Sequence, residues 1–104
     1  SIDYTPKEFS SISLADDGST AVLKTLSSET PRTILELLAE NPAPASDLAE
    51  RVDTSLQNIN HHLSNLREAG LVTTAGTWLS SKGREMTVYA LTTQRIELRI
   101  DSRQ

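Results

Sequence analysis

The chain has 104 residues, a hydrophobic fraction of 37% and a formal net charge of −4 at pH 7, so we expect one domain with a single core. No apolar run approaches the roughly 18 residues that a membrane helix needs, and the lack of cysteine excludes disulfides, thiolate nucleophiles and Cys-ligated zinc. An acidic chain ordinarily argues against nucleic acid as a partner, because phosphate binding usually requires a basic surface.

The charges are unevenly distributed along the chain. Residues 1–53 contain ten acidic and four basic residues, a net −6, whereas residues 54–104 contain four acidic and six basic residues, a net +2. An acidic front half therefore precedes a mildly basic back half, which leaves nucleic acid open as a partner. Arginine outnumbers lysine seven to three, and this acidic, lysine-poor composition favours a salt-rich cytoplasm. No secretory h-region is present, so we expect a cytoplasmic protein.

Residues 1–13 mix serine, proline and charged residues with scattered apolar ones and show no period. We therefore expect them to form a flexible arm. Helical spacing first appears after Asp16, where Ala21, Val22 and Leu26 fall at intervals that suit one face of a helix. A short first helix is predicted there.

Capping residues and prolines mark two further helices. The second is expected to begin at Thr30, which can cap it, with Pro31 in the first helical position, where the missing N–H leaves no bond unmade. Pro42 ends it, since a residue that precedes proline avoids the helical region. The third is expected over residues 46–52, with Ser46 as its cap.

The fourth helix is the most informative element of the sequence. Ser55 can cap it, and Gly70 follows it where a left-handed residue commonly ends a helix, so it is predicted over residues 56–69. At 100° per residue it has a narrow apolar stripe, formed by Leu56, Ile59, Leu63 and Leu66. The opposite face and its flanks are polar and carry few charges: Gln57, Asn58, Asn60, His61, Ser64, Asn65 and Glu68.

This polar face is unusual for a helix that merely contacts water, because Glu, Lys and Arg favour a solvated helix more than Asn, Ser or His do. Asn and Gln can pair bidentately with adenine, and Ser and His can reach bases or phosphates. A short helix, a turn and a polar-faced second helix form a helix-turn-helix, whose second helix enters the major groove by its N-terminal half. The sequence therefore indicates a DNA-reading helix, and an Asn-rich surface helix without a ligand is the alternative.

A β-hairpin is predicted after the fourth helix. Residues 71–79 and 86–91 are rich in β-branched and aromatic side chains and are separated by a glycine-containing turn. Lys82 and Arg84 lie at its tip, where they can contact phosphate or simply solubilise the turn. Beyond it, apolar and charged residues alternate over residues 96–101, which favours a further strand, although two isoleucines there also suit one face of a helix.

Other side chains have a structural interpretation beside a functional one. Trp78 and Tyr89 are expected to pack across the hairpin rather than to stack on bases. His62 lies beside the apolar stripe, which favours a half-buried packing role. For Arg67, a local ion pair with Glu68 and a phosphate contact are equally open.

The run TSLQNINHHLSNLREAGLV over residues 54–72 is the most specific motif of the chain. Together with the segments LSSETPRTILELL, SDLAERV and GTWLSSKGREMTVYAL, it resembles the winged helix-turn-helix domain of ArsR-like transcriptional regulators. The resemblance covers residues 26–91, about two thirds of the chain. The wing sequence, the low lysine content and the acidic front half resemble those of haloarchaeal members of that family.

The resemblance implies a dimeric repressor or activator that inserts the fourth helix into the major groove of double-stranded DNA. The positions that match the family's base-reading residues are Ser55, Gln57, Asn58, Asn60 and His61. The resemblance assigns contacts with the DNA backbone or the minor groove to Lys82 and Arg84. Where the family usually has Pro-Thr-Arg at the start of the second helix, this chain has Glu29-Thr30-Pro31. A phosphate-binding arginine is therefore not supplied there, and Arg32 lies one residue further on.

Metal and enzyme chemistry have no support in the sequence. Many ArsR-like relatives sense metals through cysteine pairs, or through histidine and aspartate, but this chain has no cysteine. Its only histidines, His61 and His62, point about 100° apart on a helix, so they cannot chelate one ion together. We expect no metal site and no cofactor. No nucleophile with a base and no Gly-rich phosphate loop is suggested, so no enzyme activity is expected.

The sequence thus predicts a mainly α protein with a small β-hairpin (α+β), a winged helix-turn-helix over residues 14–92 between the arm 1–13 and a dimerisation segment or tail 93–104. We expect a sequence-specific, DNA-binding transcriptional regulator that acts as a dimer, with helix 56–69 in the major groove and wing 80–85 on the backbone or minor groove. The expected dimer surfaces are the spare apolar residues Leu14, Val22, Leu26, Ile96, Leu98 and Ile100. The alternative is a winged-helix module that binds protein and not DNA, which the acidic front half also suits.

Overall fold

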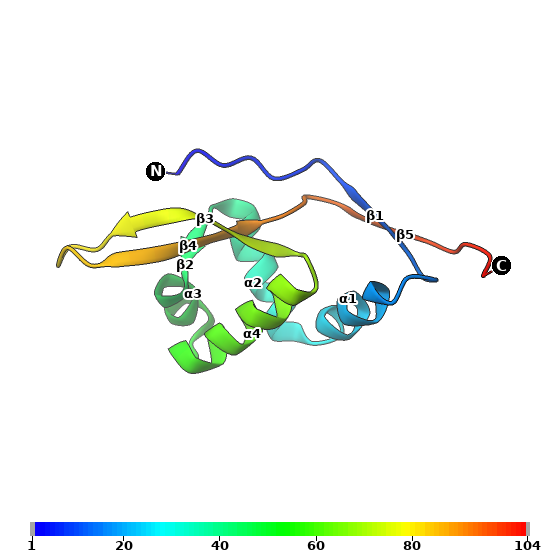
Figure 1. The fold of residues 1–104 in the computed structure, drawn as a ribbon. Coiled ribbons are helices and arrows are strands. Elements are labelled where there is room, and N and C mark those ends of the chain that lie inside the picture. The colour runs from blue at the N-terminus through cyan, green and yellow to red at the C-terminus, as the bar shows by residue number, and fades with distance from the viewer. Residues whose placement is uncertain (1, 104) are drawn as a thin grey trace.

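The computed structural model describes residues 2–103, which form four helices, a small antiparallel sheet and a two-stranded parallel ribbon (Figure 1). The helices are α1 (Gly18–Leu26), α2 (Glu29–Glu40), α3 (Ala45–Val52) and α4 (Leu56–Glu68). The strands are β1 (Ser10–Ser13), β2 (Ala43–Pro44), β3 (Val72–Leu79), β4 (Glu85–Leu91) and β5 (Ile96–Arg99). Residues 1 and 104, the outermost positions of the two expected terminal segments, lie outside the described part. The predicted class, mainly α with a β-hairpin, is confirmed.

The antiparallel sheet has the strand order β2-β4-β3. Its main part is the expected hairpin, in which β3 pairs with β4 along its length, with one register shift between Thr74 and Gly76. The two-residue strand β2 adds to the other edge of β4 and places Pro44 opposite Val88. The sequence did not predict β2, because two residues that end in proline carry no strand period.

The hydrophobic core lies between α2, α3, α4 and the sheet. Its largest fully buried side chains include Ile34, Leu48, Ile59, Leu63, Leu66 and Val88. Three of these come from α4, which confirms most of the predicted apolar stripe. Leu56 is the exception, because its side chain is 50% exposed. Leu56 lines a surface hollow together with Met86 instead.

Two helices begin earlier than the sequence predicted. The start of α2 is Glu29, with Ser28 in the capping position, so Thr30 is not the cap and Pro31 is the third helical residue. Proline is tolerated there because the first helical N–H groups have no partner within the helix. Ser46 is likewise the second residue of α3 and not its cap. No helix within residues 2–103 has the length and apolar character needed to cross a membrane.

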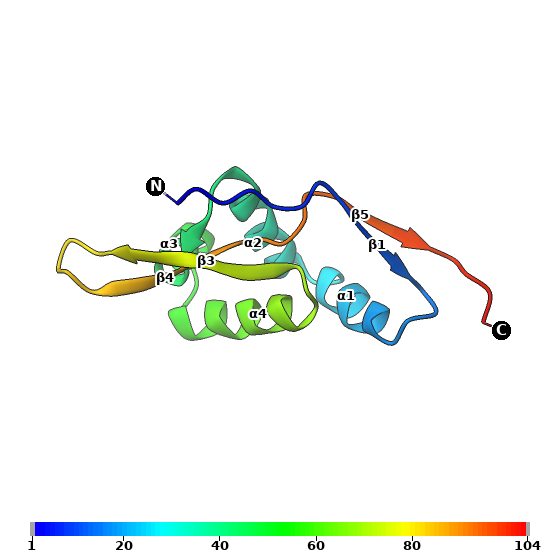
Figure 2. The same ribbon diagram turned by 45° about the horizontal axis from the view of Figure 1, so that its top comes forward.

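The expected irregular arm is partly a strand. β1 pairs in parallel with β5, which confirms the strand expected after the hairpin and places Ser10 opposite Ile96 and Ile12 opposite Leu98. Pairing between segments 86 residues apart leaves no local signature, so the sequence pattern did not reveal it. Figure 2 shows this two-stranded ribbon and α1 at one end of the molecule and the tip of the hairpin at the other. The principal-axis extents are 56 × 27 × 18 Å.

The two aromatic residues of the hairpin are not neighbours, contrary to the expectation from the sequence. Trp78 is opposite Met86 and Tyr89 is opposite Thr74. Met86 and Tyr89 are three residues apart on one strand, so their side chains leave opposite faces of the sheet. The register shift at Ala75 and the alternation of side chains along the strand therefore place Trp78 and Tyr89 on opposite faces, although the sequence predicts that they pack together.

Candidate nucleic-acid interface

The start of α4 is fixed by two side chains that the sequence placed in the site. Ser55 has extended backbone angles, and its Oγ accepts the backbone N–H of Asn58 at 3.0 Å, which confirms it as the cap. The Nδ2 of Asn58 donates to Thr54 Oγ1 at 3.0 Å, and Asn58 is half-buried. Both side chains therefore stabilise the first turn, and Asn58 offers a ligand its amide oxygen more freely than its amide nitrogen.

The exposed face of this first half of α4 carries Gln57, Asn60 and His61. Within the described structure, the side chains of Gln57 and Asn60 have no hydrogen-bond partner. The Nε2 of His61 lies 3.4 Å from Nδ2 of Asn65, one turn further along. Amide and imidazole groups are thus presented to solvent at the end of the helix that projects beyond the core.

His62 has the half-buried position that the sequence favoured for it. Burial, and to a smaller extent the neighbouring His61, lower the pKa of His62 below its ordinary value. The two imidazole rings are tilted by 58°, with their centroids 5.6 Å apart. Within residues 2–103, no group of three His, Cys, Asp or Glu side chains is arranged to hold a metal ion.

The tip of the hairpin is a tight turn closed by Ser80. The N–H of Ser80 donates to the carbonyl of Arg84 at 2.8 Å, and the N–H of Gly83 donates to the carbonyl of Ser80 at 2.9 Å. Gly83 has a φ of +77°, a left-handed conformation that glycine adopts without strain. The Oγ of Ser80 accepts the N–H of Arg84 at 3.1 Å. These bonds leave the side chains of Lys82 and Arg84 exposed, and within the described residues neither forms an ion pair.

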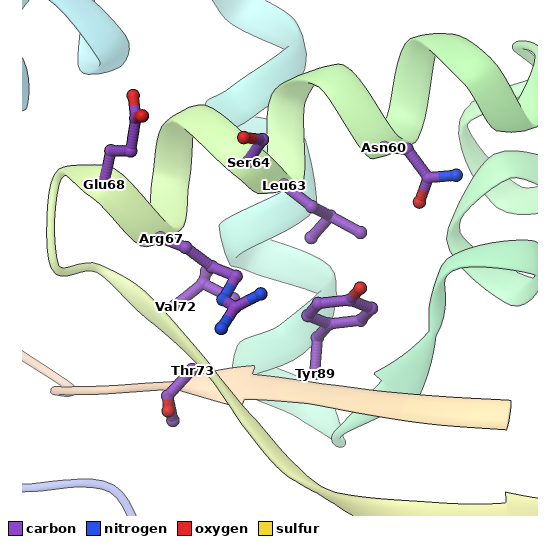
Figure 3. A pocket seen from close by; sticks show the side chains of 8 residues that line it. All are labelled: Asn60, Leu63, Ser64, Arg67, Glu68, Val72, Thr73 and Tyr89. Atoms are coloured by element: carbon purple, nitrogen blue, oxygen red, sulfur yellow. The ribbon is translucent and has the colours of Figure 1, made fainter.

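Two hollows separate α4 from the hairpin. One, of about 430 Å³, lies beside the start of α4 and includes Leu56 and Arg84 in its lining. The other, of about 610 Å³, lies further along the helix and is lined by Arg67 among others (Figure 3). Asn60 and Tyr89 line both hollows. The helix, the hollows and the basic wing tip thus form one continuous face.

Arg67 is available for a phosphate, because the alternative ion pair is not formed. Figure 3 shows its guanidinium extending across the hollow near Tyr89, whereas Glu68 points away from it. In the described part of the chain no ion pair joins Arg67 and Glu68. Arg67 and Tyr89 are site residues that the sequence did not assign. For Arg67, the only sequence signal of a place in the interface was an exposed cation in the polar part of α4. For Tyr89 there was no such signal, because its place depends on the register of β4.

Arg32 lies outside this face. Its Nη1 donates to the carbonyl of Leu26 at 2.7 Å, so the side chain connects the start of α2 to the end of α1. The chain therefore presents no arginine toward the interface at the position where ArsR-like proteins usually have one, in agreement with the sequence comparison of that segment.

Comparisons with known proteins agree with this geometry. A family described as "Helix-turn-helix domain" matches residues 26–75. The transcriptional repressor SdpR of Bacillus subtilis is 39% identical over 51 residues, which are 49% of this chain and 57% of the repressor. An ArsR-like transcriptional regulator from Rhodococcus sp. RHA1 has a TM-score of 0.57 and 35% identity over 71% of this chain and 64% of its own. The homodimeric winged helix-turn-helix DNA-binding domain Mb0332 from Mycobacterium bovis has a TM-score of 0.62 and 22% identity, with coverage of 73% and 65%.

The fold is a winged helix-turn-helix. In it, α3, a tight turn and α4 form the helix-turn-helix, and β3 and β4 form the wing. Asp53 makes the turn possible with a φ of 59°, and it is the one non-glycine residue in the described structure with a positive φ. The matched family segment includes all of α4, whereas the wing tip lies beyond it. The chain spans just over half the length of the curated repressor that it matches.

Proposed function

We propose that this chain is a sequence-specific, DNA-binding transcriptional regulator that binds double-stranded DNA as a homodimer. The observation that carries the proposal is the exposed first half of α4, where the side chains of Gln57 and Asn60 have no hydrogen-bond partner among the described residues and lie on one face with a cationic wing tip. The helix enters the major groove, and the wing contacts the backbone or the minor groove. The relatives described above, which are transcriptional regulators by name, support this assignment.

The side chains have different roles in this proposal. Gln57, Asn60 and His61 read base edges, because amides and imidazole present the donors and acceptors that bases complement. Asn58 contributes through its amide oxygen, since its nitrogen is held by Thr54. Ser55 contacts the backbone while it caps the helix. Lys82 and Arg84 bind phosphate and so contribute affinity without sequence preference.

The double variant Gln57→Ala/His61→Ala tests base reading. Asn58 is left in place because its replacement would also remove a capping contact. On DNA selected from a random pool, we expect specific binding to fall about tenfold to hundredfold, with the thermal unfolding midpoint unchanged. The control Glu36→Gln/Gln94→Ala changes two exposed residues outside the interface and should leave binding intact. Unchanged binding by the double variant would contradict the assignment and favour a protein-binding module.

A homodimer is proposed because α4 alone is short. One recognition helix contacts too few base pairs for operator specificity, so a two-fold dimer with half-sites about one turn or a multiple apart is expected. Val22, which the sequence assigned to the dimer surface, is instead a core residue with 3% of its surface exposed, and Leu26 and Ile96 pack against the core. The end of the molecule away from the wing still exposes apolar side chains that include Leu14, Leu23, Leu98 and Ile100. Sedimentation at tens of micromolar should show a dimer, and a monomer even with DNA present would contradict this proposal.

We also propose that the chain is a cytoplasmic protein adapted to high salt, of the haloarchaeal type. The support is the composition, with ten acidic and four basic residues in the first 53 and few lysines overall. Repulsion between these acidic groups is reduced as ions screen them. The thermal unfolding midpoint should therefore rise when KCl is increased from about 0.1 M to about 2 M, and a constant or falling midpoint would contradict the proposal.

A further inference from the structure

The outer edge of β5 offers unpaired backbone groups. The N–H of Ser10 donates to the carbonyl of Arg95 at 2.9 Å, and the N–H of Leu14 donates to the carbonyl of Arg99 at 2.8 Å. A strand presents alternate residues to each of its sides, so the odd-numbered residues of β5 bond to β1. The N–H and C=O groups of Leu98 and its even-numbered neighbours therefore face the other edge, which no strand of residues 2–103 covers. In Figure 2 this edge lies on the side of the ribbon away from α1.

The two faces of β5 differ in chemistry. The odd-numbered residues alternate in charge along one face: Arg95, Glu97, Arg99 and, just beyond the strand, Asp101. This face is polar, since the Oγ of Ser11 donates to Glu97 at 2.8 Å and accepts from Arg99 at 2.7 Å. The other face carries Ile96, Leu98 and Ile100. Ile96 is half-buried and packs against the core, whereas Leu98 is 46% exposed and Ile100 is 88% exposed. The outer part of this apolar face therefore lacks a cover.

We propose that the β5 strands of two copies pair antiparallel about a two-fold axis at Leu98 and join the two ribbons into one four-stranded sheet. This inference rests on the proposed function, because it names the surface through which the proposed homodimer forms. A two-stranded ribbon alone is marginally stable in water, and two more strands extend both its hydrogen bonding and its apolar face. The interface is isologous, as a two-fold dimer requires.

The alternating charges select this register. With Leu98 opposite Leu98 of the second copy, Glu97 faces Arg99 of that copy, Arg95 faces Asp101, and Ile96 faces Ile100. Every charged residue thus meets one of opposite sign. Two adjacent registers keep the same backbone groups bonded. The one centred on Glu97 places Glu97 opposite Glu97 and Arg95 opposite Arg99. The one centred on Arg99 places Arg99 opposite Arg99 and Glu97 opposite Asp101. Like charges directly opposite one another destabilise a strand pair.

Charge reversal tests the pairing directly. Glu97→Arg places arginines at both positions 97 and 99, and Arg99→Glu places glutamates at both, so each variant alone should dimerise about tenfold more weakly at an ionic strength near 0.1 M. A mixture of the two variants should form heterodimers, because the arginines at positions 97 and 99 of one chain then face the glutamates at positions 99 and 97 of the other. The double variant Glu97→Arg/Arg99→Glu should dimerise like the original chain. Dimerisation that no single reversal weakens would overturn the proposal.

A cysteine cross-link tests the register without dependence on salt. The chain has no cysteine, so Leu98→Cys introduces one thiol, and directly opposed residues have Cα atoms about 5.5 Å apart, within the range of a disulfide. Ile100→Cys is the matched control, because its own copy lies four residues, about 14 Å, along the strand. We expect an oxidised dimer for Leu98→Cys and none for Ile100→Cys. A cross-link only for Ile100→Cys, or for neither variant, overturns this register.

The two proposals fail in distinguishable ways. If Leu98→Cys cross-links and the reversed-charge variants form heterodimers, the strand pairing stands even where Gln57→Ala/His61→Ala leaves DNA binding unchanged and the proposed function fails. If that double variant loses specific DNA binding while no β5 experiment affects the dimer, the DNA-binding function stands and the β5 interface is wrong.

Discussion

Asn60 of α4 and Tyr89 of β4 line both hollows between α4 and the hairpin. Figure 3 shows the ring of Tyr89 directed toward the helix, with Asn60 on the same side. Asn60 is exposed and Tyr89 is half-buried. A DNA backbone that passes along this face would therefore meet a phenol hydroxyl as well as the amide of Asn60.

Tyr89→Phe should weaken DNA binding while the fold is retained. The variant keeps the ring that packs against the core and removes only the hydroxyl, so we expect a loss of about threefold to tenfold, the value of one hydrogen bond. Binding titrations on selected DNA measure this loss. Tyr4→Phe, in the only other tyrosine, should have no effect. Equal affinities for Tyr89→Phe and the original chain would show that the residue only packs.

Ser55→Ala should destabilise the chain because it removes the cap of α4. The Oγ of Ser55 accepts the N–H of Asn58, and loss of such a cap costs about 1 kcal/mol. Ser46→Ala is the matched control, since Ser46 lies inside the first turn of α3 and makes no cap bond; its cost should stay below about 0.5 kcal/mol. Urea unfolding without DNA measures both. A larger loss for Ser46→Ala than for Ser55→Ala would contradict the observed helix starts.

The sequence predicted well those elements whose start and end are both marked by capping or turn residues close to them in the chain. For α4, Ser55 caps the start and Gly70, with a φ of 76°, follows the end, so local signals sufficed. The start of α2 was less certain locally, because Ser28 and Thr30 are both residue types that cap. β1 and β2 could not be found from local signals, since each is a strand only through a partner that is distant in the sequence.

The candidate site was predictable to the extent that it lies on one helix. Helical periodicity alone placed Gln57 and His61 on the exposed face, as the structure has them. Periodicity also placed Leu56 in the core, where the structure does not, because a helical wheel cannot show where the covering elements end. The positions of Arg67 and Tyr89 along one hollow depend on how β4 lies against α4, which no local pattern contains.

Removing the cations of the wing should affect all DNA sequences alike. In Lys82→Ala/Arg84→Ala we expect weaker binding and a salt slope that is flatter by about one unit for each lost phosphate contact. The turn should persist, because Ser80 bonds to the backbone of Arg84 and not to its side chain. Lys7→Ala/Lys24→Ala removes the same charge from exposed positions away from the wing and should leave the slope unchanged. Equal slopes for the two double variants would contradict a phosphate contact by the wing.

His62 should make the stability of the fold depend on pH. Its pKa is lowered from 6.5, chiefly by burial and then by His61, so the unfolded chain takes up a proton at a higher pH than the folded chain does. The free energy of unfolding should therefore fall as the pH drops below about 6.5. His62→Gln should remove this part of the dependence, whereas His61→Gln should keep most of it because burial is the larger cause. Urea unfolding at about pH 5 and pH 7.5 measures the difference, and a dependence that is unchanged in His62→Gln would assign it to other groups.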